Sequence, residues 1–344
     1  MQTKKKVIGN TILLAAVFAL TVYGVFHGED LGALKDSIMH ADIRWLIPGV
    51  ALVTFFIWGE SIIIWYMMRT FQIHLKKRIC FLFSSVGFFF SCITPSASGG
   101  QPMQIYYMKK ERIPIPVSTV ILMIITITYK LVLVVIGLGI LFFGRGFLYH
   151  YLKEILPVYY LGLSLNVFCV SFMTVLVFHP VMAEKIIIAG THIFEKLHLM
   201  KHGEERRRKL QASMEIYRET AAYLLGHKKV ILNVILITFV QRMALFAVTC
   251  LVYRSFALNG TSMWDVVFLQ AVISVSVDML PLPGGMGISE TLFLKIFASV
   301  FGSLTLPAMV ISRGMAYYSQ ILISALFTMT AQIYYMFRRA QIPE

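Results

Sequence analysis

The chain has 344 residues, of which 58% are hydrophobic and 14% are charged, and its mean hydropathy is +0.75. Soluble proteins average about 45–50% apolar and about 25% charged residues, so this composition excludes soluble globular, disordered, collagen-like and disulfide-rich classes. The net charge of +14 does not indicate a DNA-binding module, because such modules gather their basic residues on a solvated face. The sequence therefore predicts an all-α polytopic integral membrane protein whose basic residues mark the cytoplasmic side.

Eight apolar segments follow one another along the chain: residues 7–26, 45–68, 79–94, 117–143, 157–178, 230–253, 266–280 and 306–337. The first follows three lysines and precedes no A-x-A-like cleavage site, which predicts a retained span rather than a removed signal peptide. The third and seventh are too short to cross about 30 Å of hydrocarbon comfortably, and each continues into a Pro- and Gly-rich stretch. Short, interrupted segments of this kind predict re-entrant hairpins.

The charges indicate which segments cross the membrane. A full crossing by residues 79–94 would place Lys109, Lys110 and the basic loop 182–229 outside the cell, against the positive-inside rule. If residues 79–108 instead enter from the cytoplasm and return, these basic groups all share the cytoplasmic side.

With the first hairpin entering from the cytoplasm, the order of the spans predicts that residues 266–301 form a second hairpin that enters from the outside. Arg338 and Arg339 then place the C-terminus in the cytoplasm, on the same side as the N-terminus. The prediction is one membrane domain, residues 1–344, with about six full spans and two oppositely oriented re-entrant hairpins. Paired broken helices of this kind resemble the inverted-repeat design in which the breaks form a substrate site.

The long cytoplasmic loop, residues 182–229, contains a predicted amphipathic helix. Apolar residues recur there at spacings of four and three: Leu210, Met214, Tyr217, Ala221 and Leu224. A helix lying on an anionic membrane surface and a solvated helix packed on neighbouring loops both fit this pattern. His198 and His202 stand four apart, but no third ligand is clear, so no metal site is predicted.

The first hairpin breaks at TPSASGGQP, residues 94–102. Proline and glycine end the helix there, and the freed backbone groups are tolerated at membrane depth only in protein or beside a polar cavity. A new helix beginning near Gln101 would direct its positive dipole end at the cavity and suit an anionic group such as a lipid phosphate. A simple packing kink is the alternative. The candidate contacts in this break are Thr94, Ser96, Ser98, Gly99, Gly100 and Gln101.

The second hairpin breaks at DMLPLPGGMGISE, residues 278–290, where two acids, Asp278 and Glu290, flank the turn. Acids in an apolar segment are costly unless they pair or face water. Three bases embedded in predicted spans are candidate partners, Lys130, Arg242 and Arg313, and both a structural salt-bridge network and a functional pathway fit them. Glu60 is a further buried acid. The remaining candidate contacts in this break are Pro283, Gly284, Gly285 and Gly287.

The two breaks resemble a known family. The stretches TPSASGGQPMQIYYMKK and LPLPGGMGISE, with a charged loop between them and an arginine in the last span, are similar to the membrane domain of bacterial lysylphosphatidylglycerol synthases. That group includes stand-alone proteins classed as flippase-like, and the resemblance extends from about the second span to the end. It implies a multi-pass protein of the bacterial inner membrane.

The resemblance implies two separate activities, of which only one belongs to the membrane region. Full-length members join a membrane region, which moves aminoacylated phosphatidylglycerol to the outer leaflet, to a C-terminal domain that transfers lysine from lysyl-tRNA. This chain stops at Glu344, so we expect no transferase domain and no enzymatic activity of the chain by itself. The family label, phosphatidylglycerol lysyltransferase, with its associations with lipid metabolism and antibiotic resistance, would then require a separately encoded partner.

The expected function is translocation or binding of a phospholipid such as phosphatidylglycerol or its lysyl derivative. The bases would neutralise the phosphate, while Asp278 and Glu290 would orient those bases or contact an amino group of the lipid. No nucleotide-binding motif is visible, and no cofactor or metal is expected, so movement would be passive or coupled to an ion or the membrane potential. An aminoacyltransferase, a transporter of a soluble solute and a membrane scaffold are the alternatives; no direct nucleic-acid partner is expected, and a homo-oligomer is compatible with the sequence.

Overall fold

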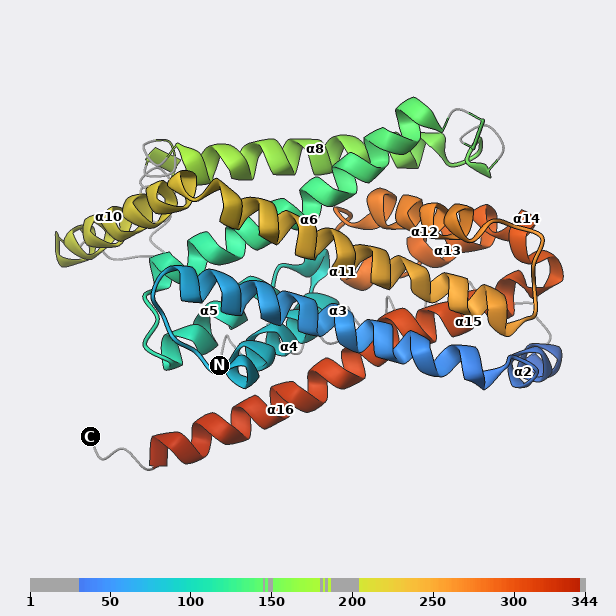
Figure 1. The fold of residues 1–344 in the computed structure, drawn as a ribbon, viewed down its shortest axis with the longest axis horizontal. Helices are drawn as coiled ribbons and strands as arrows, with labels where there is room; N and C mark the ends of the chain where they lie inside the picture. The colour runs from blue at the N-terminus through green and yellow to red at the C-terminus, as the bar shows by residue number, and fades with distance from the viewer. Residues whose placement is uncertain are drawn as a thin grey trace.

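The computed structural model describes residues 31–144, 146–147, 151–179, 182, 185–186 and 204–340. Within these ranges every regular element is helical, as predicted, and the helices run mostly along the long axis of the molecule (Figure 1). The first predicted span, residues 7–26, and the histidines at 198 and 202 lie outside the described residues. So do residues 341–344.

Four helices are long and apolar enough to cross a membrane: α3 (Ile43–Thr70), α6 (Ile115–Phe143), α8 (Leu156–Phe178) and α11 (Lys228–Ser255). They correspond to four of the predicted apolar segments. A fifth candidate is a pair of helical stretches, Pro283–Ile296 and Ala298–Tyr335, that are bent by 50° relative to each other. The length and composition of the described helices thus support four spans, or five, of a multi-pass membrane protein.

Two helix–break–helix units lie between the long helices. In the first, α4 (Lys77–Ile93) and α5 (Gly100–Lys110) pack against each other across the short turn η1 (Pro95–Ala97). In the second, α12 (Met263–Val277) packs against α13 (Ile288–Ile296) across the turn η2 (Pro283–Gly285), and α14 (Ala298–Phe301) and η3 (Gly302–Leu304) follow. The turns η1 and η2 contact each other, so the two breaks meet inside the molecule.

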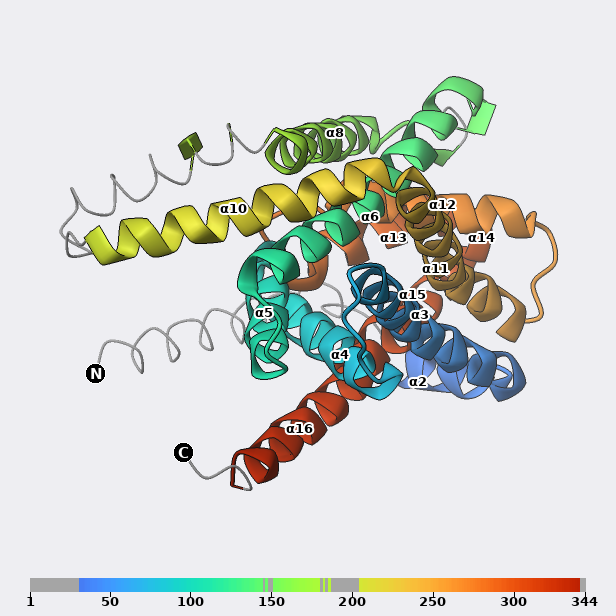
Figure 2. The same cartoon turned by 60° about the vertical axis from the view of Figure 1, so that its left-hand side comes forward.

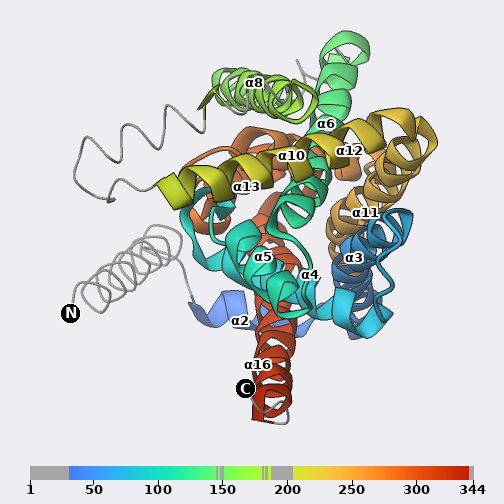
Figure 3. The ribbon, with the colours of Figure 1, turned by 90° about the vertical axis from the view of Figure 1, so that its left-hand side faces the viewer.

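The two units approach that meeting point from opposite ends. The outer ends of α4 and α5 share a hydrophobic cluster with the end of α3 and the starts of α6 and α11. The second unit belongs to a different cluster toward the opposite end, beside α2 (Leu31–Met39) (Figure 1). Figure 3 looks onto the end that carries α5 and α10 (Glu204–Gly226). Basic residues at the start of α4 and at the end of α5 lie at that end: Lys76, Lys77, Lys109 and Lys110.

The predicted apolar stripe of residues 210–224 lies on α10, which packs across α6 and α8 (Figure 2). Met214, Tyr217, Ala221 and Leu224 are buried in the same cluster as the ends of α3 and α5. The stripe therefore faces the bundle, which favours the packed-helix alternative over a helix lying on lipid.

The last predicted segment, residues 306–337, is not one continuous α-helix. It consists of α15 (Thr305–Arg313), a π-helical segment η4 (Gly314–Tyr318) and α16 (Ser319–Ala340). The hydropathy of the segment is continuous, so the sequence pattern alone does not reveal this change of winding.

Close backbone contact joins α8 to the second unit. Asn166 of α8 donates from Nδ2 to the carbonyl oxygens of Gly162, at 2.9 Å, and of Val275 on α12, at 3.2 Å. A Cβ atom added to Gly162 would lie 2.5 Å from the Val275 carbonyl oxygen. The absence of a side chain at Gly162 therefore allows the two helices to approach, as small residues do at helix interfaces in membranes.

We expect Gly162→Ala to destabilise the fold by about 1–3 kcal/mol, because the added methyl group overpacks a backbone contact. The measurement is the midpoint of unfolding in mixed micelles. Gly139→Ala is the matched control, since nothing lies within 4 Å of a Cβ there. Equal midpoints for the two variants would contradict the close contact of α8 with α12.

Candidate functional site

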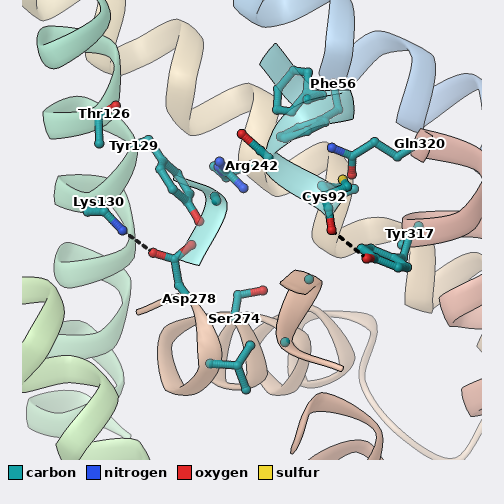
Figure 4. A pocket seen from close by; sticks show the side chains of 18 of the residues that line it. Phe56, Cys92, Thr126, Tyr129, Lys130, Arg242, Ser274, Asp278, Tyr317 and Gln320 are labelled. Carbon is teal, nitrogen blue, oxygen red and sulfur yellow. Dashed lines mark hydrogen bonds and ion pairs between the residues drawn. The ribbon is translucent and has the colours of Figure 1, made fainter. Parts of the chain in front are cut away.

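A cavity of about 530 Å³ lies where the two breaks meet (Figure 4). Its walls come from both helix–break–helix units and from α3, α6, α8, α11, α15, η4 and α16. The volume falls within the range of about 300–1,000 Å³ that is typical of small-molecule sites. The lining mixes aromatic and aliphatic side chains with a limited number of charged and amide groups.

The structure brings part of the predicted site to this cavity. The predicted residues that line it are Ser98, Gln101, Lys130, Arg242, Asp278, Gly284, Gly285 and Arg313. Those that do not line it are Thr94, Gly99, Gly100, Pro283, Gly287 and Glu290. The side chain of Ser96 lies outside the described part of the structure.

The first break is held by its own side chains. Thr94 donates from Oγ1 to the Phe90 carbonyl oxygen at 2.6 Å and accepts the Gly99 amide at 2.8 Å, which satisfies backbone groups freed by the break. A Cβ atom on Gly100 would lie 2.1 Å from Ser91 Oγ, so α5 starts directly against α4. Gln101, in the first turn of α5, donates to Thr126 on α6. The N-terminus of α5 therefore lies at the cavity wall.

The second break is held by an ion pair. Gly284 and Gly287 adopt φ angles of +57° and +85°, which are accessible mainly to glycine. Glu290 Oε2 accepts a hydrogen bond from the Gly287 amide at 2.7 Å. Its Oε1 accepts a hydrogen bond from Arg313 Nε, also at 2.7 Å. Arg313 also donates from Nη2 to the Gly284 carbonyl oxygen at 3.1 Å. Both charges are thus engaged in fixing the turn.

A second ion pair links α6 to the end of α12. Lys130 Nζ lies 2.5 Å from Asp278 Oδ2 (Figure 4). Both side chains are largely buried, with 11% and 14% of their surface exposed. This cation, like Arg313, has an acidic partner within the protein.

Arg242 differs from these two cations in its surroundings. Its guanidinium carbon lies 3.4 Å from the centre of the Tyr129 ring and 4.9 Å from that of Phe56, so the charge is sandwiched between two aromatic faces (Figure 4). Its Nε is buried without a hydrogen-bond partner, and among the described residues no ion pair reaches it. Stacking on aromatic rings leaves the in-plane N–H donors of a guanidinium free for another acceptor.

Tight contact between α3 and α11 sets the position of Arg242. Gln241 donates from Nε2 to the Phe56 carbonyl oxygen at 2.7 Å. A Cβ atom on Gly59 would lie 3.0 Å from Gln241 Cγ, so the two helices interlock beside the cavity. Glu60, the next residue after Gly59, also lines the cavity and accepts a hydrogen bond from Gln104 Nε2 at 2.7 Å.

Sequence reasoning missed several lining residues. Glu60 was identified as a buried acid but was not assigned to the site, and Gln104, Tyr129 and Tyr317 were not selected at all. Gln104 lies three residues after Gln101, so both amides project from neighbouring faces of α5, a spacing that a helical reading of the break could have revealed. Nothing in the sequence marks the stacking of Tyr129 on Arg242, because the two residues belong to different helices.

The arrangement can hold an anion at Arg242 and a cationic group at Glu60. A guanidinium with free donors suits a phosphate or carboxylate. Among the described residues no group of three His, Cys, Asp or Glu side chains could hold a metal ion.

We expect opposite effects on stability from two charge-removing variants. Glu290→Gln leaves Arg313 unpaired and should cost about 3–5 kcal/mol, the usual cost of breaking a buried pair. Arg242→Gln removes a charge that forms no ion pair with any described residue and should leave the unfolding midpoint unchanged or raised. A large loss of stability in Arg242→Gln would mean that the protein itself satisfies this charge.

A search of proteins with curated functions found no match. The family model of the lysylphosphatidylglycerol synthase TM region matches residues 7–324, which include both breaks, Arg242 and the two ion pairs. The protein therefore belongs to the lysylphosphatidylglycerol synthase TM family of multi-pass membrane proteins.

Proposed function

We propose that the protein translocates a phospholipid across the bacterial inner membrane by receiving the headgroup in the cavity between the two breaks. The observation that carries this proposal is that Arg242 lies in the cavity wall and forms no ion pair with any residue that the structure describes. A buried cation without a protein partner is costly in a membrane, and such residues default to substrate or ion pathways. The phosphate of a lipid would supply the missing acceptor.

The two cations that form ion pairs, Lys130 and Arg313, support the choice of Arg242 as the residue that binds the phosphate. Lys130 and Arg313 already neutralise Asp278 and Glu290, so the protein does not need a ligand to balance them. A phosphate drawn to Arg242 would give this cation the acidic partner that Lys130 and Arg313 already have. The acyl chains would stay in the bilayer, beside the exposed apolar side chains of α8 and α16 such as Phe168 and Leu326.

Glu60 extends the proposal to the rest of the headgroup. It lines the same cavity as Arg242, and its described hydrogen bond comes from the Gln104 amide rather than from a cation. An amino group on the headgroup would therefore meet a carboxylate while the phosphate meets Arg242. This pattern suits lysylphosphatidylglycerol as well as phosphatidylglycerol itself.

The proposed topology places the basic end in the cytoplasm, makes the α4–α5 and α12–α13 units re-entrant hairpins, and completes about six full spans. In a variant without native cysteines, Lys110→Cys should react with an impermeant maleimide only from the cytoplasmic side. Lys295→Cys, at the end of α13, should react only from the outside. Labelling of both from one side would contradict opposite entry of the two hairpins.

The translocation test uses proteoliposomes with headgroup-labelled phosphatidylglycerol and its lysyl derivative. Transbilayer movement should be faster than in protein-free vesicles, and Arg242→Gln should slow it at least tenfold because the phosphate loses its anchor. Arg254→Gln is the matched control, since Arg254 lies on the same helix, away from the cavity, and bonds Asn259.

Equal movement in the wild type and Arg242→Gln would contradict the proposal. Uptake of a soluble anion without lipid movement would instead assign the cavity to a soluble substrate. Lysyl transfer from lysyl-tRNA by the purified chain would favour the enzyme alternative.

A further inference from the structure

The π-helical segment η4 interrupts the last helical stretch at the level of the cavity. Tyr317 and the preceding Arg313 both line the cavity, and Gly314–Tyr318 is wound as a π-helix between α15 and α16. A π-helical turn accommodates an extra residue within an α-helix. Such turns are rare in proteins, and those that occur are often found at functional sites. The two helices on either side of η4 have different partners.

The helix before η4 belongs with the second break. α15 packs against α13. Arg313, its last residue, bonds the Glu290 carboxylate of α13 and the Gly284 carbonyl of η2. Any movement of the second hairpin must therefore carry α15 with it.

The helix after η4 belongs with the first hairpin. α16 packs along α4, where the Phe81 and Phe327 rings meet edge to face at 4.8 Å. Near the basic end, Tyr107 of α5 donates to Gln332 Oε1 at 2.7 Å. Tyr335 of α16 donates to Glu111 Oε1, just after α5, at 2.9 Å. The first hairpin and α16 thus form a second body.

Tyr317 joins the two bodies. Its hydroxyl donates to the Cys92 carbonyl oxygen, in the last turn of α4, at 3.0 Å (Figure 4). Its ring lies directly beside η2, since a Cβ atom on Gly284 would lie 2.2 Å from ring carbon Cε2. The Arg313 guanidinium carbon lies 4.5 Å from the centre of the same ring. One side chain from the π-helical segment therefore contacts the end of α4, just before the first break, and the second break itself.

We propose that η4 is the hinge between these two bodies and that Tyr317 is the latch that holds the breaks together. The inference rests on the proposed translocation, for which it supplies the conformational step. Conversion of the π-helical turn to α-helical winding would rotate α16 relative to α15 by about 100°, the angle per residue of an α-helix. Smaller adjustments of the same turn separate η1 from η2 and open the cavity, as relative movement of repeats does in transporters with broken helices.

The test measures amide hydrogen exchange of the full chain in lipid nanodiscs, without added ligand. Tyr317→Phe keeps the ring but removes the hydroxyl donor to Cys92. Exchange should become about three- to tenfold faster at residues 95–101 and 284–289, the effect of losing one hydrogen bond on the opening equilibrium. Tyr318→Phe is the matched control in the same turn, because no described hydrogen bond uses its hydroxyl and it does not line the cavity.

A second measurement follows the thiol of Cys92, which is buried at the cavity wall. Its alkylation rate should rise in Tyr317→Phe and stay at the wild-type value in Tyr318→Phe. Equal exchange and alkylation in both variants would overturn the latch, and so would faster exchange spread evenly over all helices. Faster exchange confined to the two breaks, without any lipid movement in vesicles, would support the hinge but contradict the proposed translocation.

Discussion

A peptide group that leaves a helix within apolar surroundings must find another partner, and the centre of this structure satisfies that constraint. Thr94 satisfies groups of the first break, and Glu290 and Arg313 satisfy groups of the second. The two turns then contact each other. The cavity lies at that contact, which places polar groups in the interior of an otherwise apolar bundle.

The charges around the cavity fall into two kinds. Two cations are neutralised by acids of the second break or its edge, and these pairs tie α6 and α15 to that break. Arg242 lies between two aromatic rings and forms no ion pair with any described residue, and the close contact of α3 with α11 fixes it there. A buried cation without an ion-pair partner is costly in apolar surroundings, and in the proposed function the phosphate of a lipid supplies that partner.

The sequence was sufficient for the helical class, for four of the long apolar helices and for the two Pro/Gly breaks, because hydropathy and helix-breaking residues act locally. It also selected Lys130, Arg242, Asp278, Glu290 and Arg313, since charges in apolar segments are conspicuous. It did not determine which charges pair: Lys130 and Asp278 are separated by 148 positions in the numbering, and their meeting depends on how α6 packs against α12. The π-helical winding of Gly314–Tyr318 was also hidden, because it depends on tertiary contacts of Arg313 and Tyr317.

The most direct test of the central claim is photo-crosslinking with a phospholipid that carries a photoreactive group on its headgroup, followed by mass spectrometric mapping in native membranes. The account predicts adducts on residues around Arg242, such as Tyr129 and Phe56, and competition by unlabelled phospholipid. Adducts restricted to the outer faces of α8 and α16 would contradict it, because the headgroup would then never enter the cavity between the breaks.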